Sequence, residues 1–273
     1  MEFLSALSRT REISCAALIA SRPMPADTLT RLLAKHRRAR VHLEELNRAV
    51  RHYVDSEPYR IESALSADQL EYVFTAHDIK PVPEEISLIA GDVVHNCRAC
   101  LDHLAWEISL SPDRTTSFGI LRNHPPSGAP TIAGGLSHAH QAALVSVQPY
   151  QTHRARPEFA PLEVLRTLDN TDKHQVILTG VSAVNTNVHG EPCNYRGSAP
   201  EADYHFCVLE EGAKVATFRC SEPSPEMSVP DFDIHPTVDL VDVRPTGFRF
   251  DARQVLWDIH KAVQATVNAF EPF

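Results

Sequence analysis

The sequence predicts an α+β fold with a mainly helical core and small antiparallel β hairpins. Long stretches repeat apolar residues at helical spacing, and shorter stretches between them alternate apolar and polar residues. The two kinds do not follow one another in the regular strand–helix–strand order of an α/β protein. We expect long helices at about 27–56, 84–110, 161–178 and 251–269. With 273 residues, 43% of them hydrophobic, the chain can bury a large core.

The first third of the chain is expected to hold two long helices around a hairpin. Asp27 is a suitable N-cap for the first helix, and Pro58 closes it. Two strands follow, over 59–64 and 70–76, joined by 65–69. Pro83, followed by two glutamates, begins the second long helix, because proline and acidic residues favour a first helical turn.

The rest of the chain alternates loops, helices and short strands. Residues 111–134 are expected to form a loop with an extended piece over 118–121, and a short helix over 136–147 ends at Pro149. The third long helix starts at Pro161, with Gly180 as its stop. Strands over 204–209 and 214–220 flank a turn at 211–212, and 238–243 and 247–250 add further strands. Asp251 caps the last helix.

No linker divides the chain, so residues 25–273 are expected to form a single domain. Residues 1–24 are expected to be a poorly ordered extension. No run of about 18 apolar residues exists, which predicts no membrane partner. We expect a cytoplasmic protein, because the N-terminal stretch lacks a clean signal-peptide cleavage site.

The formal net charge of −9 disfavours a protein whose main role is to coat DNA. One basic run stands against this balance. It is either a solvated helix face or a patch that contacts phosphate. Its cations are Lys35, Arg37, Arg38, Arg40, Arg48 and Arg51.

The six cysteines are irregularly spaced, which is typical of a reducing compartment with buried thiols. Cys97 and Cys100 form a C-x-x-C pair on the apolar stripe of the second helix. A zinc–thiolate site needs a second pair, and the other cysteines are not spaced as one.

The segment from Gly91 to Trp106 is the most informative part of the sequence, because as a helix it has two distinct faces. One arc is apolar: Ile89, Val93, Cys97, Cys100, Leu101, Leu104 and Ile108. The other is polar: Asp92, His95, Asn96, Arg98, Asp102 and His103. Aspartate, histidine and asparagine are weak helix formers, so a site or a specific polar network requires them. Arg98 and Asp102 are four residues apart and can form an ion pair.

The second polar group lies near the end of the third long helix. Asp172 falls in the middle of its apolar side and Asp169 near the edge. Carboxylates that face a core need partners. We therefore expect both to lie against His95, Arg98 and His103. Alternatively, the helix ends near Asn170 and releases residues 172–174 into a turn.

The string Arg98-Ala-Cys-Leu-Asp-His103 resembles the Arg-x4-His motif of HEPN-superfamily proteins. That resemblance implies a helical, metal-independent ribonuclease in a toxin or phage-defence setting, in which the arginine and histidine act on a phosphate at a homodimer interface. In a regular helix, however, the two side chains point about 140° apart. The blocks 91–106 and 168–174 also resemble a group of uncharacterised bacterial proteins with a His-Asn-x-Arg-x3-Asp-His-Leu helix and a later Asp-Lys-His.

Three functions follow as hypotheses. The first is a HEPN-like ribonuclease without a cofactor, with Arg98 on the phosphate, His103 as acid and base, Asp102 and His95 beside them, and RNA and a second copy as partners. The second is a metal-dependent hydrolase, with a divalent transition metal held by His95, His103, Asp92, Asp169, Asp172 and His174. The third is a non-catalytic binding or structural protein. Serine-nucleophile, P-loop and Rossmann motifs are missing from the sequence.

Overall fold

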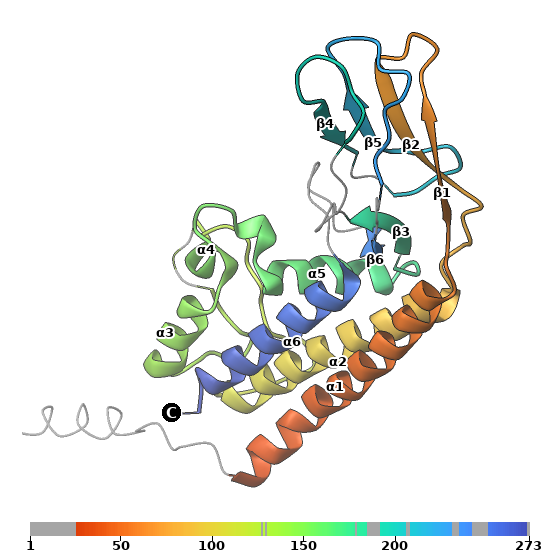
Figure 1. The fold of residues 1–273 in the computed structure, drawn as a ribbon. Coiled ribbons are helices and arrows are strands. Elements are labelled where there is room, and N and C mark those ends of the chain that lie inside the picture. The colour runs from red at the N-terminus through yellow and green to blue at the C-terminus, as the bar shows by residue number, and fades with distance from the viewer. Residues whose placement is uncertain are drawn as a thin grey trace, which may run out of the picture. The chain divides into compact units, whose positions relative to one another are not determined.

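The computed structural model describes residues 26–126, 128, 130–177, 179–184, 192–205, 208–230, 235–241 and 251–271. The extension expected at 1–24 and the strand expected over 247–250 lie outside these residues. Helices and antiparallel sheets together make an α+β fold, as predicted (Figure 1). No helix in these ranges is both long and apolar enough to span a bilayer.

The long helices agree closely with the sequence, with one exception. The helical elements are α1 (Ala26–Asp55), α2 (Glu84–Ile108), α3 (His138–Ser146), α4 (Pro149–Thr152), the 3-10 turn η2 (Pro157–Phe159), α5 (Pro161–Asp172) and α6 (Ala252–Asn268). The prediction that the third long helix reaches residue 178 is wrong. The amides of His174 and Gln175 both donate to the carbonyl of Thr171, so the backbone turns after Asp172.

The strands form two antiparallel sheets. Four strands pair in the order β1 (Arg60–Leu65), β2 (Glu71–His77), β5 (Lys214–Arg219) and β4 (Glu201–Tyr204). The other sheet pairs β3 (Thr179–Val184) with β6 (His235–Leu240).

The strand predicted over 204–209 needs correction. β4 lies earlier than the predicted 204–209, because Glu201 pairs with Arg219 and Tyr204 with Ala216. The turn at Gly212, just before β5, is hydrogen-bonded to β2, because the amide of Gly212 donates to the carbonyl of Ala76. Residues 118–121 lie in a stretch without helix or strand, in agreement with the expected loop, and the amides of Phe118 and Leu121 donate to the side chains of Asp102 and Gln148.

The chain divides into two compact units, and α1, α2, α5 and α6 contribute residues to both. The described part of the first unit spans 26–38, 96–166 and 259–271. Its core includes Leu101, Leu104 and Leu144, and Phe118 meets Phe270 edge-on at 6.4 Å between ring centroids. The second unit spans 39–95 and 167–258, and its core draws on helices and sheets alike: Leu43, Leu46, Ile86, Leu168, Val181 and Phe218.

Candidate functional site

Helix α2 has the two faces that the sequence predicts. All seven residues assigned to its apolar arc are buried. On the polar arc, Asp92, His95 and His103 are exposed to solvent. Asn96 is the exception, because it is buried with an exposed fraction of only 6%. The polar arc is therefore narrower than the wheel indicated.

Arg98 forms the predicted ion pair with Asp102. The guanidinium donates through Nη2 to Oδ1 at 2.9 Å and through Nε to Oδ2 at 3.2 Å. Oδ1 also accepts the backbone amide of Phe118 at 2.9 Å, which fixes the loop after α2 onto the helix. The side chain of Arg98 is only 16% exposed. Arg98 and Asp102 therefore serve a structural contact within the first unit.

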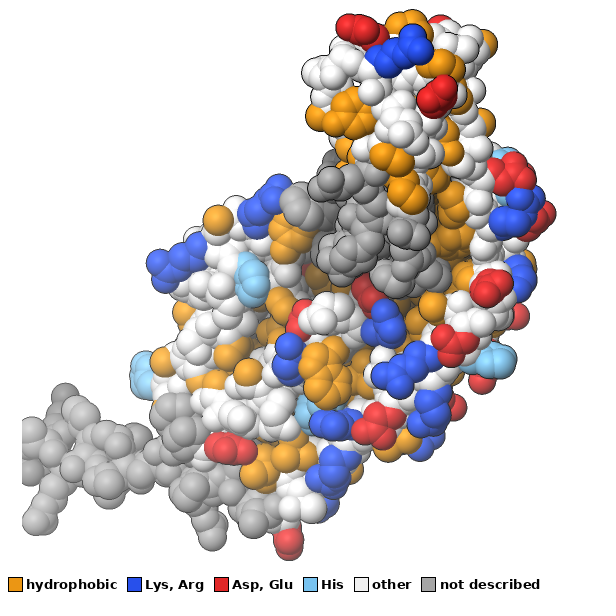
Figure 2. Space-filling view, viewed as in Figure 1, with side chains coloured by type: hydrophobic (Ala, Val, Ile, Leu, Met, Phe, Trp, Pro, Cys, Tyr) orange, Lys and Arg blue, Asp and Glu red, His pale blue; other side chains and the backbone are white. Residues whose placement is uncertain are grey.

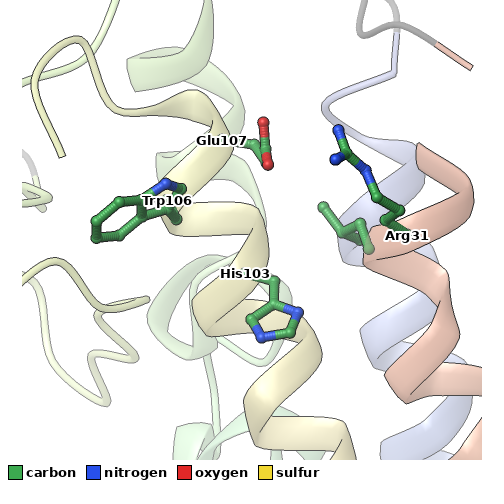
Figure 3. Close-up of a pocket in the computed structure, with 5 residues that line it drawn as sticks. Arg31, His103, Trp106 and Glu107 are labelled. Atoms are coloured by element: carbon green, nitrogen blue, oxygen red, sulfur yellow. The ribbon is translucent and has the colours of Figure 1, made fainter. Parts of the chain in front are cut away.

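His103 lines a pocket between the first part of α1 and the last part of α2 (Figure 3). The pocket holds about 280 Å³, and Arg31 and Leu32 line it from α1. Trp106 and Glu107 line it beside His103 on α2. In Figure 3 the imidazole lies on the side of α2 that faces α1, and the indole extends from the other side.

Three of the lining residues, Arg31, His103 and Trp106, suit a phosphate-bearing ligand, whereas the carboxylate of Glu107 disfavours an anion. Arg31 is exposed, and its Nη2 lies 3.4 Å from Thr28 Oγ1, a distance typical of a weak hydrogen bond. A guanidinium binds phosphate oxygens through two parallel hydrogen bonds. Imidazole is the side chain that gains and loses a proton near neutral pH. The indole of Trp106, 46% exposed, offers a flat apolar surface.

A second polar cluster lies in the other unit, where α5 meets the first part of α2. The carboxylate of Asp172 lies against Gly91, whose added Cβ would overlap Asp172 Oδ1. Desolvation raises the pKa of Asp172, and neighbouring Asp169 and Asp92 raise it further, whereas His95 lowers it. Asp172 thus meets the polar arc of α2, but it is exposed rather than buried in the core as the wheel indicated.

Asp169 is buried, with an exposed fraction of 5%, as the wheel indicated. Its Oδ2 accepts a hydrogen bond from Lys173 Nζ at 2.6 Å, one turn further along the chain. The sequence did not identify this lysine as the partner. His174 is exposed in the turn that follows α5.

The described residues include no group of three or more histidine, cysteine, aspartate or glutamate side chains placed to hold a metal ion. The residues named for a metal site do not form such a group: His95, His103, Asp92, Asp169, Asp172 and His174. No observation on the described residues therefore favours the metal-dependent hydrolase over the other hypotheses.

The C-x-x-C pair belongs to the core. Cys97 and Cys100 are fully buried free thiols, and Cys100 Sγ donates to the carbonyl of Leu32 at 3.5 Å. Burial raises the pKa of Cys100 to about 12 and also raises the pKa of Cys97. Because the thiolate is the reactive form, neither thiol is suited to act as a nucleophile.

Sequence reasoning named His103 as a candidate but did not name the other residues that line this pocket. Arg31 stands 72 positions before His103, and their proximity is a tertiary contact that no local pattern encodes. A usable signal for Trp106 was present, because it lies three residues after His103 on the same helix. On the helical wheel it falls in the middle of the polar arc, between His95 and Asp92, which marks this large apolar side chain as exposed.

Comparisons with protein-family models, with curated proteins and with solved structures find no match to this chain. The functional proposal therefore depends on the chemistry of the pocket that holds Arg31 and His103.

Proposed function

We propose that this protein cleaves RNA without a metal ion, with His103 as the proton-transfer group and Arg31 as the phosphate-binding group. The observation that carries the proposal is that these two side chains line one pocket on facing helices. Proton transfer by a positioned imidazole and charge stabilisation by a guanidinium are the two contributions that phosphodiester cleavage most needs.

The proposed reaction uses only the RNA, the pocket and water. The ribose 2′-oxygen attacks the adjacent phosphorus while His103 takes the 2′-hydroxyl proton. The bond from phosphorus to the 5′-oxygen breaks, and that oxygen takes a proton from water. The products are a 2′,3′-cyclic phosphate and a 5′-hydroxyl, and His103 returns its proton to solvent. Arg31 stabilises the charge that develops on the phosphate oxygens.

Arg98 has a different role in this proposal from the one that the HEPN resemblance implies. Its guanidinium is bound by Asp102, the residue next to His103. We therefore assign Arg98 and Asp102 as positioning residues, which hold the last turns of α2 against the Phe118 loop. Arg31 takes the role of phosphate-binding cation.

The proposal is tested by cleavage of a labelled single-stranded RNA in excess EDTA. His103→Ala should lower kcat by about 100-fold or more, the usual contribution of general acid–base catalysis. Arg31→Ala should lower kcat/KM by about 10- to 100-fold, which corresponds to the loss of a hydrogen bond to a charged group. Mass spectrometry of the product should show the cyclic phosphate.

His138→Ala is the matched control, because His138 is an exposed histidine on α3 that does not line the pocket. It should cleave as the unmodified protein does. Circular dichroism of each variant checks that the fold is intact. Cleavage by His103→Ala at the unmodified rate would refute the proposal. The HEPN resemblance also implies a homodimer, which light scattering of the same preparation measures.

A non-catalytic binding protein is the second candidate, and the network of Arg98, Asp102 and Phe118 favours it. That network places Arg98 and Asp102, two residues of the Arg-x4-His string, in a contact that holds the Phe118 loop on α2. Under this alternative the pocket binds a phosphate-bearing ligand but catalyses no reaction. RNA binding without cleavage, in the presence or absence of EDTA, would favour it over the ribonuclease.

A further inference from the structure

The face of α1 that lines the pocket carries a row of three cations. Arg31, Lys35 and Arg38 are spaced at i, i+4 and i+7, so they share one side of the helix. At a rise of 1.5 Å per residue the row extends over about 10 Å. Figure 2 shows Lys and Arg side chains gathered along α1, with some Asp and Glu between them. One end of the row, at Arg31, lies in the pocket with His103.

These three cations are available to an external anion. Arg31 and Arg38 are exposed and Lys35 is partly exposed. Within the described ranges, none of the three forms an ion pair with a carboxylate. Arg40, by contrast, is bound to Glu44 at 3.2 Å. In a chain with a net charge of −9, this row is a local attraction for a polyanion. The carboxylate of Glu107, which lines the pocket and points toward Arg31 in Figure 3, opposes that attraction at one end of the row.

Trp106 adds a second kind of contact, on the side of α2 away from the row. Its indole is about half-exposed at the pocket. A large apolar ring at the surface is buried favourably only when a ligand stacks on it. A row of cations with an exposed aromatic ring in the same pocket is typical of sites that bind single-stranded nucleic acid, since each base offers a flat face to stack. In a duplex those faces are covered by the neighbouring bases.

We infer that a single strand of RNA lies along α1, with successive phosphates on Arg38, Lys35 and Arg31. Beyond Arg31 the strand crosses α2 past His103, and a base stacks on Trp106 on the side of α2 away from α1. The assignment of the strand as RNA rests on the proposed function. The two intervals between three successive phosphates cover about 7 Å in a stacked strand, at about 3.4 Å each, and more in an extended one, so a row of about 10 Å can reach all three. The phosphate bound at Arg31 is then the one beside His103. Binding along the row therefore places a phosphodiester at the proposed cleavage position.

The binding test uses a fluorescent 2′-O-methyl oligouridylate of about ten nucleotides, within the usual range for single-strand binding. This strand has no free 2′-hydroxyl, so binding is measured without cleavage. Three neutralised phosphates predict that the logarithm of the association constant falls with the logarithm of salt concentration at a slope of about −2. Fluorescence anisotropy at several salt concentrations measures that slope.

Single substitutions along the row should each remove one phosphate contact. Lys35→Ala and Arg38→Ala should weaken binding severalfold and make the slope shallower by about 0.7. Arg37→Ala is the matched control, because Arg37 is an exposed arginine in the same turn whose side chain lies on another face and donates to the carbonyl of Thr30. It should leave both affinity and slope unchanged.

Trp106→Ala should weaken binding by about 5- to 150-fold, the usual effect of losing one stacked base, and should leave the slope unchanged. The same strand annealed to its complement should bind more weakly than the free strand. Equal slopes for Lys35→Ala, Arg38→Ala and Arg37→Ala would overturn the inference, as would equal affinity for single strand and duplex.

The two proposals fail in different ways. A protein that binds the 2′-O-methyl strand as described but cleaves no RNA contradicts the proposed function and supports the cation row. A protein that cleaves RNA through His103, yet binds the strand equally well without Lys35 and Arg38, supports the proposed function and refutes the row.

Discussion

The carboxylate of Asp172, the last residue of α5, lies directly against the Cα of Gly91 on α2. A β-carbon at Gly91 would occupy the space that the carboxylate oxygen fills. Glycine inside a helix lowers stability by about 1 kcal/mol relative to alanine. The sequence accepts this cost at a buried position because the carboxylate needs the space.

The effect of Gly91→Ala on stability should therefore depend on Asp172. In an Asp172→Ala background we expect Gly91→Ala to stabilise the protein by about 1 kcal/mol, through helix propensity alone. With Asp172 present, the added methyl group must displace the carboxylate, so the gain should be smaller or reversed. A double-mutant cycle by urea denaturation measures the coupling. An equal gain in both backgrounds would show that the contact has no energetic consequence.

Asp172→Asn should stabilise the protein at neutral pH. The pKa of Asp172 is raised in the fold, mainly by desolvation. When the pKa of a carboxyl is higher in the folded state, ionising it destabilises the fold. The protein therefore loses stability as the pH rises from the unfolded-state pKa, about 3.8, through the folded-state pKa. Asparagine keeps the shape without the charge. Thermal unfolding should show a higher Tm for the variant at about pH 7 and no difference near pH 3. A lower Tm at pH 7 would contradict this assignment.

The sequence predicted the elements of the fold well where one local pattern decided them. The buried arc of α2 could be predicted because the apolar residues on that arc recur at helical spacing, and all of them are buried. The end of α5 was mispredicted because Val176 continued the apolar period, yet it is 44% exposed after the turn. Periodicity alone could not indicate where the backbone hydrogen bonds stop.

The candidate site was only partly predictable for the same physical reason. His103 and the pairing of Arg98 with Asp102 depend on neighbours within one helix, and both were identified. The partner of His103 in the pocket, Arg31, depends on how α1 packs against α2. Asp169 forms an ion pair with Lys173, four residues away, which the sequence analysis did not consider.

Asp102→Ala should destabilise the protein more than Asp102→Asn does. Alanine removes both the ion pair with Arg98 and the acceptor of the Phe118 amide, a loss of about 1 to 3 kcal/mol. Asparagine retains one oxygen that can accept the amide, so about half of that loss should remain. Urea denaturation at neutral pH ranks the variants. Equal effects of the two substitutions would show that the Phe118 amide does not depend on this side chain.

His140→Gln should protect the protein against mild acid. Desolvation lowers the pKa of His140, although a backbone hydrogen bond to Ile108 partly opposes the shift. The ring lies 5.9 Å from that of Phe270, measured between centroids, which gives a protonated imidazole an apolar neighbour. Because the unfolded chain binds the proton more readily, stability is retained above about pH 6.5 and falls as pH drops from there toward the folded-state pKa.

Glutamine carries no charge at any of these pH values, so it removes this contribution while keeping a polar side chain. The free energy of unfolding, measured by urea denaturation at about pH 7.5 and pH 5, should fall less for His140→Gln than for the unmodified protein. His138→Gln, on the exposed first residue of α3, provides the control for losing a histidine without losing a desolvated one. If both substitutions change the acid dependence equally, desolvation at His140 is not its cause.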